Sequence, residues 1–253
     1  MDRPRLSIVT CANRVNPYFD AAIQSLAVTC AGQPVQRVLV ANGGWQPSAS
    51  IRDGFDLVVM TEQGGLGHAR NLGVAHSTGE WITFFDSDDL LDARYVVATL
   101  AFAGHPAVGS FFFNTTAMVA ENGELMADWT PALQRYPDAL ALRLAHPYTG
   151  ATLVIQSELF RHIGGYQWQG YAEDYELTLR LVFQQAHRQA PARNPEAVYL
   201  YRQHGDTMSS NARKKVEGIR AVQMHHLITH RRWSMLLGVA ASTLRLARIG
   251  RAA

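Results

Sequence analysis

Apolar residues in the first 90 positions gather into four short runs, which are separated by segments of helical spacing. The runs lie at residues 5–11, 35–41, 55–60 and 80–86 and consist largely of Val, Ile, Leu and Phe. Short runs of this kind, bounded by Pro, Asn and Gly, are typical of buried β-strands. We therefore predict four strands in this part of the chain.

Helices are predicted between these strands. Residues 17–32 have apolar side chains at helical spacing, residues 66–79 also form a helical segment, and a glycine closes each. Strands that alternate with crossover helices form a parallel sheet of right-handed βαβ units. In such a sheet the strand ends at Thr10, Asn42 and Asp86 would meet at one edge, where ligands bind.

The second half of the chain has a more mixed pattern. We predict one or two strands at 109–120, one strand each at 151–156 and 197–204, and an amphipathic helix at 172–187. We see no internal repeat and no long linker. The simplest division is one α/β domain over residues 1–210 with a Rossmann-like, mostly parallel sheet, followed by a helical tail over 211–253.

Composition is that of a globular protein, with 47% hydrophobic and 17% charged residues among 253. The two cysteines, Cys11 and Cys30, form neither a disulfide framework nor a CxxC metal motif, which favours a reducing cytoplasmic setting. The first residues lack a signal-peptide pattern, and no apolar run reaches the roughly 18 residues that span a bilayer. We expect a cytoplasmic protein that at most binds a membrane surface.

Charge is distributed unevenly. Residues 213–253 contain nine Lys and Arg and one acid, Glu217, whereas the remainder contains 14 basic and 20 acidic residues. The tail therefore carries +8 and the body −6, which predicts contact between the tail and an anionic surface. Residues 230–251 mix Trp233 and several leucines with arginines, so they could lie in a membrane interface. Packing on the α/β domain or on a partner subunit is the alternative.

Four carboxylates, Asp86, Asp88, Asp89 and Asp92, follow the fourth apolar run. Like charges at this density repel one another, so a cation is expected nearby. Asp-x-Asp oxygens suit Mg²⁺ or Mn²⁺, which also share oxygens with a substrate diphosphate. Alternatively, Asp89 or Asp92 could cap the next helix, which is predicted at 90–100. A calcium loop is disfavoured because its characteristic glycine and glutamate are missing.

Several motifs occur together in one order. They are LSIVTCANR at 6–14, the stretch 65–92 that ends in the carboxylates, the pair Glu173-Asp174, and YRQHGDTMS at 201–209. Jointly they resemble family 2 glycosyltransferases, which have the GT-A fold. The resemblance implies inverting transfer of a sugar from a nucleotide-diphosphate donor to an acceptor hydroxyl, in polysaccharide biosynthesis at the cell envelope.

The resemblance also implies roles for residues 86–89, which we call the acidic turn. In such enzymes the second Asp of the Asp-x-Asp motif ligates the metal and the first contacts ribose or metal-bound water, and these correspond to Asp88 and Asp86. Ser87, between them, is expected to lie against the donor. His204 resembles the histidine that completes the metal or diphosphate site in relatives. Without its motif, His204 would be read as a surface histidine beside a turn.

By the same resemblance Asp174 is the expected general base, at a helix start where the dipole favours a carboxylate. Glu173 would contact acceptor or sugar, or simply be a helix N-terminal charge. Arg70 resembles a nucleotide contact, with an ion pair to a neighbouring Asp as the alternative. Thr10 and Cys11 would pass under the base through backbone contacts.

The sequence departs from the family pattern at one position. Asn42 stands where relatives carry an acid that reads uracil, although an amide can also donate to and accept from a pyrimidine edge. A UDP-sugar therefore stays the first choice of donor, with dTDP and GDP open. Tyr166, Trp168 and Tyr171 could stack on an acceptor sugar or belong to the core.

The expected acceptor is a glycan or a lipid-linked saccharide, and no nucleic acid partner is expected. Processive relatives carry Gln-x-x-Arg-Trp, but here Thr229 replaces the glutamine, which favours transfer of a single sugar. Two rival functions remain. A sugar nucleotidyltransferase should show a glycine-rich basic loop near the first strand, where residues 10–17 show none. An inactive carbohydrate-binding relative should have lost Asp88 or Asp174, and both are present.

Overall fold

The computed structural model describes residues 4–106, 108–126, 149–184, 191–205 and 211–252. Their contacts divide them into two compact units. The sheet unit comprises described residues 4–106, 108–126, 149–166 and 191–203. The helical unit comprises described residues 167–184, 204–205 and 211–252. The predicted division at residue 210 stays a prediction, although the structure groups the helix predicted at 172–187 with the tail.

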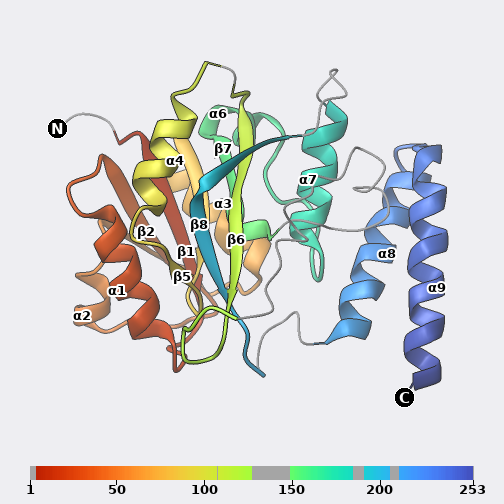
Figure 1. Cartoon of the computed structure of the whole chain (residues 1–253), viewed down its shortest axis with the longest axis horizontal. Helices are drawn as coiled ribbons and strands as arrows, with labels where there is room; N and C mark the ends of the chain where they lie inside the picture. The colour runs from red at the N-terminus through yellow and green to blue at the C-terminus, as the bar shows by residue number, and fades with distance from the viewer. Residues whose placement is uncertain (1–3, 107, 127–148, 185–190, 206–210, 253) are drawn as a thin grey trace. The chain divides into compact units, whose positions relative to one another are not determined.

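One sheet runs through the sheet unit (Figure 1). Its strands are β1 (Leu6–Ala12), β2 (Val35–Ala41), β3 (Leu57–Met60), β4 (Trp81–Asp86), β5 (Leu90–Leu91), β6 (Phe111–Val119), β7 (Leu153–Gln156) and β8 (Ala192–Arg202). Their order is β3-β2-β1-β4-β7-β6-β8-β5. The first four are mutually parallel, β7 is antiparallel to β4 and β6, and β8 is parallel to β6. The predicted α/β class with its parallel first half is confirmed.

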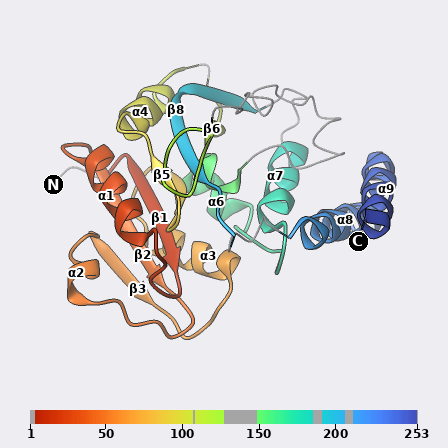
Figure 2. The ribbon, with the colours of Figure 1, turned by 60° about the horizontal axis from the view of Figure 1, so that its bottom comes forward.

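Helices cover both faces of this sheet (Figure 2). They are α1 (Phe19–Cys30), α2 (Ala49–Arg52), α3 (Leu66–His76), α4 (Tyr95–Ala103) and α6 (Ser157–His162). Buried side chains of α1 and α4 form one core with Ile8, Leu39 and Phe85. On the opposite face α3 approaches closely at Gly73, where an added Cβ would lie 2.4 Å from Val9 Cγ1. That approach brings the side chains of α3 to the sheet.

Two boundaries differ from the sequence prediction. The last strand begins at Ala192, upstream of the predicted residue 197. The helix predicted to begin near Leu90 begins at Tyr95, because Leu90 and Leu91 pair with β8 as the short strand β5. Asp92 follows β5, and its carboxylate accepts the N–H of Arg94 at 2.9 Å, just before α4.

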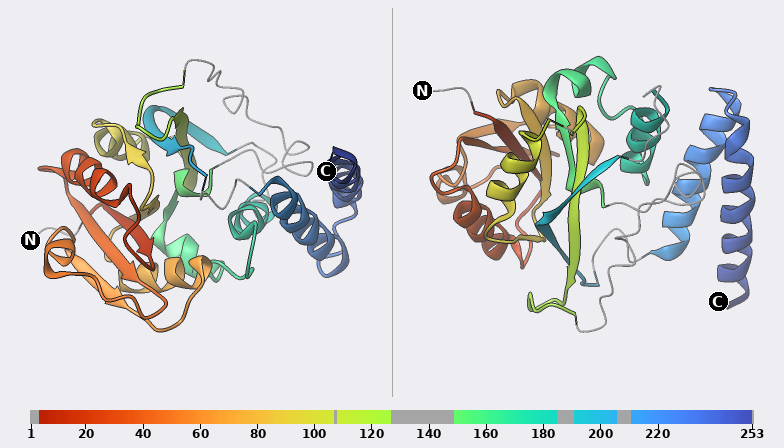
Figure 3. Two further views of the ribbon diagram at one scale, coloured as in Figure 1. Left: turned by 90° about the horizontal axis from the view of Figure 1, so that it is seen from below. Right: turned by 45° about the horizontal axis from the view of Figure 1, so that its top comes forward.

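The helical unit contains α7 (Glu173–Gln184), α8 (Ala212–Ile228) and α9 (Leu236–Ala252), with a short 3₁₀ turn at Trp233–Met235 (Figure 3). The tail is helical, as predicted. Its core is made of Tyr175, Leu179, Ile219, Val222 and Met235. Because these residues come from α7, α8 and the 3₁₀ turn, α7 and the tail share one hydrophobic core.

Candidate functional site

The carboxyl ends of β1, β2 and β4 meet at one edge of the sheet. Cys11 lies opposite Asp86 in the β1–β4 register, and Ala12 lies opposite Ala41 in the β1–β2 register. The N–H of Asn42 donates to the carbonyl of Ala12 at 3.0 Å. The predicted convergence of these three strand ends is therefore confirmed.

Side chains along β1 point in opposite directions at this edge. Thr10 is fully buried, and its hydroxyl has no hydrogen-bond partner among the described residues, so its predicted backbone contact with the base stays a prediction. Cys11 faces the α3 side, where burial raises the pKa of its thiol to about 12. The thiol is therefore neutral at physiological pH. Asn42 is also buried, at the start of the loop after β2.

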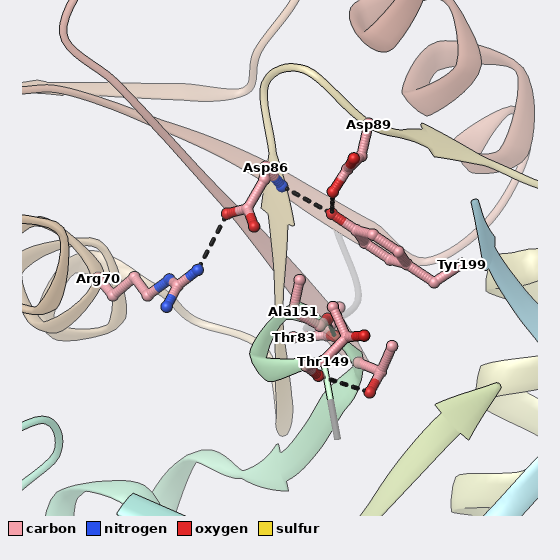
Figure 4. A network of polar contacts seen from close by, with 8 residues as sticks. Arg70, Thr83, Asp86, Asp89, Thr149, Ala151 and Tyr199 are labelled. Atoms are coloured by element: carbon pink, nitrogen blue, oxygen red, sulfur yellow. Dashed lines mark hydrogen bonds and ion pairs between the residues drawn. The ribbon is translucent and has the colours of Figure 1, made fainter. Parts of the chain in front are cut away.

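Arg70 of α3 reaches the first aspartate of the acidic turn (Figure 4). Its Nη2 donates to Asp86 Oδ1 at 2.9 Å, and the guanidinium carbon lies 5.4 Å from the Phe84 ring centre and 5.5 Å from that of Tyr166. The guanidinium is buried, whereas the Asp86 side chain is 31% exposed. The ion pair considered from the sequence thus exists, and the nucleotide contact of Arg70 stays a prediction.

Asp89 is buried and joins the acidic turn to β8 through hydrogen bonds (Figure 4). Its Oδ2 accepts the hydroxyl of Tyr199 at 2.7 Å, and its Oδ1 accepts the backbone N–H of Arg202 at 2.7 Å. The same Tyr199 oxygen accepts the N–H of Asp86 at 3.1 Å. Tyr199 therefore bridges both ends of the turn, and the capping alternative for Asp89 is wrong.

Arg202 also hydrogen-bonds to the acidic turn, a contact that the sequence did not predict. Its Nε donates to the carbonyl of Asp88 at 2.8 Å, and its guanidinium lies 4.9 Å from the ring centre of Tyr18. Ser87 is held from another side, because Asn16 Nδ2 donates to both its carbonyl and its hydroxyl at 3.2 Å. The only sequence signal for Arg202 was its place in the motif at 201–209.

Electrostatics at the turn match the repulsion expected from the sequence. Burial, with the charges of Asp86 and Asp88, raises the pKa of Asp89 well above its usual range. Burial and the nearby carboxylates also raise the pKa of Tyr199, so its hydroxyl keeps the proton that it donates. A cation beside Asp86 and Asp88 would relieve this repulsion.

The carboxylates of this turn could bind a metal ion whose other ligands come from water and a bound substrate. Among the described residues, no three His, Cys, Asp or Glu side chains converge into a ready metal site. Mg²⁺ and similar ions need only one or two carboxylates when water and phosphate oxygens complete their shell. Asp86 and Asp88 are partly exposed and supply such carboxylates.

The remaining predicted site residues belong to the helical unit. Glu173 and Asp174 open α7, as predicted, and Asp174 Oδ1 accepts the N–H of Tyr175 at 2.8 Å. Glu173 is buried and Asp174 is half-buried. His204 is half-buried and lies two residues beyond the end of β8. The functional roles of these three residues stay predictions.

The three aromatic residues before α7 differ in environment. Tyr166 is buried in the sheet unit, with its ring centre 5.5 Å from that of Phe84, and its backbone is held by Asn71 at 2.8 Å. It is a core residue. Trp168 is half-buried in the helical unit, where its Nε1 donates to the carbonyl of Tyr171 at 3.1 Å. Stacking of Trp168 or Tyr171 on a sugar stays a prediction.

Replacing Tyr199 with phenylalanine should loosen the acidic turn. The change leaves the N–H of Asp86 and a buried oxygen of Asp89 without this partner, which should cost about 2 kcal/mol of unfolding free energy. The affinity for Mn²⁺ that is predicted at this turn should also fall. Urea unfolding and metal titration measure the two effects.

Tyr95→Phe is the matched control for this change. Tyr95 is an equally buried tyrosine in the same aromatic cluster, but its hydroxyl contacts Thr83, at 3.5 Å. We expect Tyr95→Phe to alter stability without altering the affinity for Mn²⁺. An equal loss of Mn²⁺ affinity in both variants would contradict a positioning role for Tyr199.

Comparison with known proteins gives one family match. The family described as Glycosyl transferase family 2 matches residues 7–164. EpsH of Bacillus subtilis, which is named as a glycosyltransferase, is 27% identical over 110 residues, covering 41% of this chain and 32% of EpsH. Glycosyltransferase GlyA of Streptococcus pneumoniae is 28% identical over 98 residues, covering 36% of this chain and 14% of GlyA. The matches thus span a third or less of these relatives.

Two solved structures show the same fold. TarS 1–349 of S. aureus in complex with UDP-GlcNAc has a TM-score of 0.64 at 17% identity, covering 93% of this chain and 71% of that one. Mannosyltransferase PcManGT of Pyrobaculum calidifontis, in complex with GDP-Man and Mn²⁺, has a TM-score of 0.63 at 17% identity, covering 100% and 76%. The predicted GT-A fold is confirmed.

Proposed function

Since the chain belongs to glycosyltransferase family 2, we propose that it transfers one sugar, with inversion, from a nucleotide-diphosphate donor to an acceptor hydroxyl. The observation that carries this proposal is the acidic turn at the carboxyl edge of the sheet. There Asp86 and Asp88 stay partly exposed while Asp89, Tyr199 and Arg202 fix the turn from behind. Rigid carboxylates at this edge suit a donor diphosphate with its metal.

The leaving diphosphate is the group that this edge must stabilise. Asp88, together with Asp86 and His204, would hold Mn²⁺ or Mg²⁺, which supplies positive charge where the diphosphate develops its own. Ser87 lies between the two aspartates and faces the same ligand. Support comes from PcManGT, whose complex contains GDP-Man and Mn²⁺.

The acceptor hydroxyl must lose a proton as it attacks the sugar. Asp174 is the proposed general base, and the N–H of Tyr175, which donates to its carboxylate, would hold it in one orientation. Glu173, beside it at the start of α7, is proposed to contact the acceptor or the donor sugar. Inversion follows if this base works on the face of the sugar opposite the diphosphate.

The nucleotide is proposed to bind across the ends of β1 and β2. The backbone of Thr10 and Cys11 would pass under the base, and the Asn42 amide would read its edge. Arg70 would contact the nucleotide, either beside its hydrogen bond to Asp86 or in place of it. UDP is the first choice, with dTDP and GDP as the other candidates. UDP-GlcNAc is bound in the TarS structure and GDP-Man in the PcManGT structure, which supports UDP and GDP as candidates.

The proposed acceptor is a glycan or a lipid-linked saccharide at the cytoplasmic face of the membrane, in envelope polysaccharide synthesis. The basic tail supports this location, because an acceptor carried by lipid would lie at a surface that attracts cations. Thr229 in place of the glutamine of Gln-x-x-Arg-Trp supports transfer of a single sugar.

A nucleotide panel tests the proposed donor. In the presence of Mn²⁺, UDP should raise the melting temperature of the protein more than dTDP or GDP does, because ligand binding to the folded state stabilises it. Removing the metal with EDTA should abolish the shift. Hydrolysis of the matching nucleotide sugar should then release that nucleotide. A protein that no nucleoside diphosphate stabilises, with or without metal, would contradict the proposal.

A further inference from the structure

One side of α9 exposes large apolar side chains. Leu237 and Leu244, seven residues apart and therefore on one side of the helix, are 59% and 64% exposed. Trp233, in the 3₁₀ turn that leads into α9, is 70% exposed. Ser242 lies on the opposite side of the helix, where its hydroxyl bonds Gln223 of α8. Leu237 and Leu244 therefore point away from α8.

Positive charge borders this row. Arg245 and Arg248 are exposed on α9, and Arg248 lies one turn beyond Leu244 on nearly the same side. From residue 213 onward the chain has nine basic residues and one acid. That acid, Glu217, bonds Arg213 at 2.9 Å. The surface of the tail is therefore apolar and cationic together.

We propose that the side of α9 with Leu237, Leu244 and Arg248, together with the exposed Trp233 of the turn before it, docks on a bilayer that contains anionic phospholipids. Helices that lie in a membrane interface combine buried leucine and tryptophan with flanking cations in this way. Tryptophan is also enriched at the level of the lipid headgroups. The helix would lie on the membrane, and no helix among the described residues is long and apolar enough to cross one.

Charge decides between a bilayer and a second copy of the chain as the occupant. Two copies that met through this side of α9 would bring their exposed arginines, Arg245 and Arg248, together, and the like charges would repel. Anionic headgroups would attract these arginines, and the apolar region below the headgroups would take up Leu237, Leu244 and the indole of Trp233. The surface contains none of the residues proposed for sugar transfer, so docking and transfer can fail separately, whereas the membrane location proposed for the acceptor rests on the same tail.

Vesicle sedimentation of the full chain tests the docking surface. The protein should bind vesicles of phosphatidylglycerol and phosphatidylcholine, bind pure phosphatidylcholine far less, and dissociate at high salt. Leu237→Glu/Leu244→Glu should weaken binding to the anionic vesicles by about tenfold or more, because two inserted apolar groups become anions. Leu237→Ser/Leu244→Ser, which adds no charge, should weaken it in the same direction.

Val28→Glu/Val97→Glu is the matched control, since these valines of the sheet unit are 57% and 50% exposed and the charge change is identical. It should bind vesicles as the unchanged protein does. Equal binding of the α9 variants and the unchanged protein would overturn the proposal, as would equal binding to neutral and anionic vesicles. A dimer that dissociates in the α9 variants, without vesicle binding by the unchanged protein, would identify a self-association surface instead and also overturn it.

Discussion

Asp88→Asn should lower kcat/KM for sugar transfer by about 10³-fold or more, the largest effect that we expect from one substitution. Asparagine keeps the size of the side chain but removes the negative charge that would hold the metal against the diphosphate. The loss should appear in donor binding as well as in turnover. Nucleotide release at increasing Mn²⁺ concentration measures both.

Asp92→Asn is the control for this change. Asp92 is the next acid along the chain, and its carboxylate accepts the N–H of Arg94 before α4. We expect its activity to stay within about twofold of the unchanged enzyme, because a hydrogen bond within the turn before α4 affects local stability and not the donor. Full activity of Asp88→Asn at ordinary metal concentrations would show that Asp88 does not hold the metal.

Asp174→Asn has the second largest expected effect, a loss of about 10² to 10⁴-fold in kcat. The amide cannot accept the proton of the acceptor hydroxyl, although it keeps the shape of the side chain. Donor binding should persist, because the diphosphate and the nucleotide are proposed to bind elsewhere. Thermal shift with the nucleotide should therefore be unchanged while sugar transfer is lost.

Glu158→Gln provides the comparison, since Glu158 is an exposed acid in the first turn of another helix, α6. Neutralising a helix N-terminal charge at that position should leave transfer unaffected. If Asp174→Asn retained its kcat, or if it lost nucleotide binding in proportion to activity, the assignment of Asp174 as general base would be wrong.

The sequence predicted the first half of the sheet well because β1, β2 and β4 are short segments in which apolar residues predominate. Strand ends of a parallel sheet share one edge, so the neighbourhood of Asn42 and Asp86 followed from the pattern alone. The short strand β5 could not be predicted, because its two leucines are strand residues only through pairing with β8, about 110 positions later. Pairing of distant segments leaves no local periodicity.

The supports of the acidic turn were missed for the same reason. Tyr199 and Arg202 lie in a strand whose sequence, AVYLYR at 197–202, gives no sign of these contacts, and only the fold brings them behind Asp89. The sequence also left the role of Asp89 open between a helix cap and a metal neighbour. Its burial decided against the cap, and burial of a single carboxylate is a tertiary property that composition and spacing do not contain.

The position of Tyr199 and Arg202 in β8 limits how far the chain could be shortened without loss of their hydrogen bonds to the acidic turn. The family match ends at residue 164, yet Tyr199 and Arg202, which hold both ends of the acidic turn, follow it by more than thirty positions. A fragment that stops at the family boundary would keep every carboxylate of the turn and lose the strand that orders them. The smallest autonomous donor-binding piece of this protein therefore has to extend through β8.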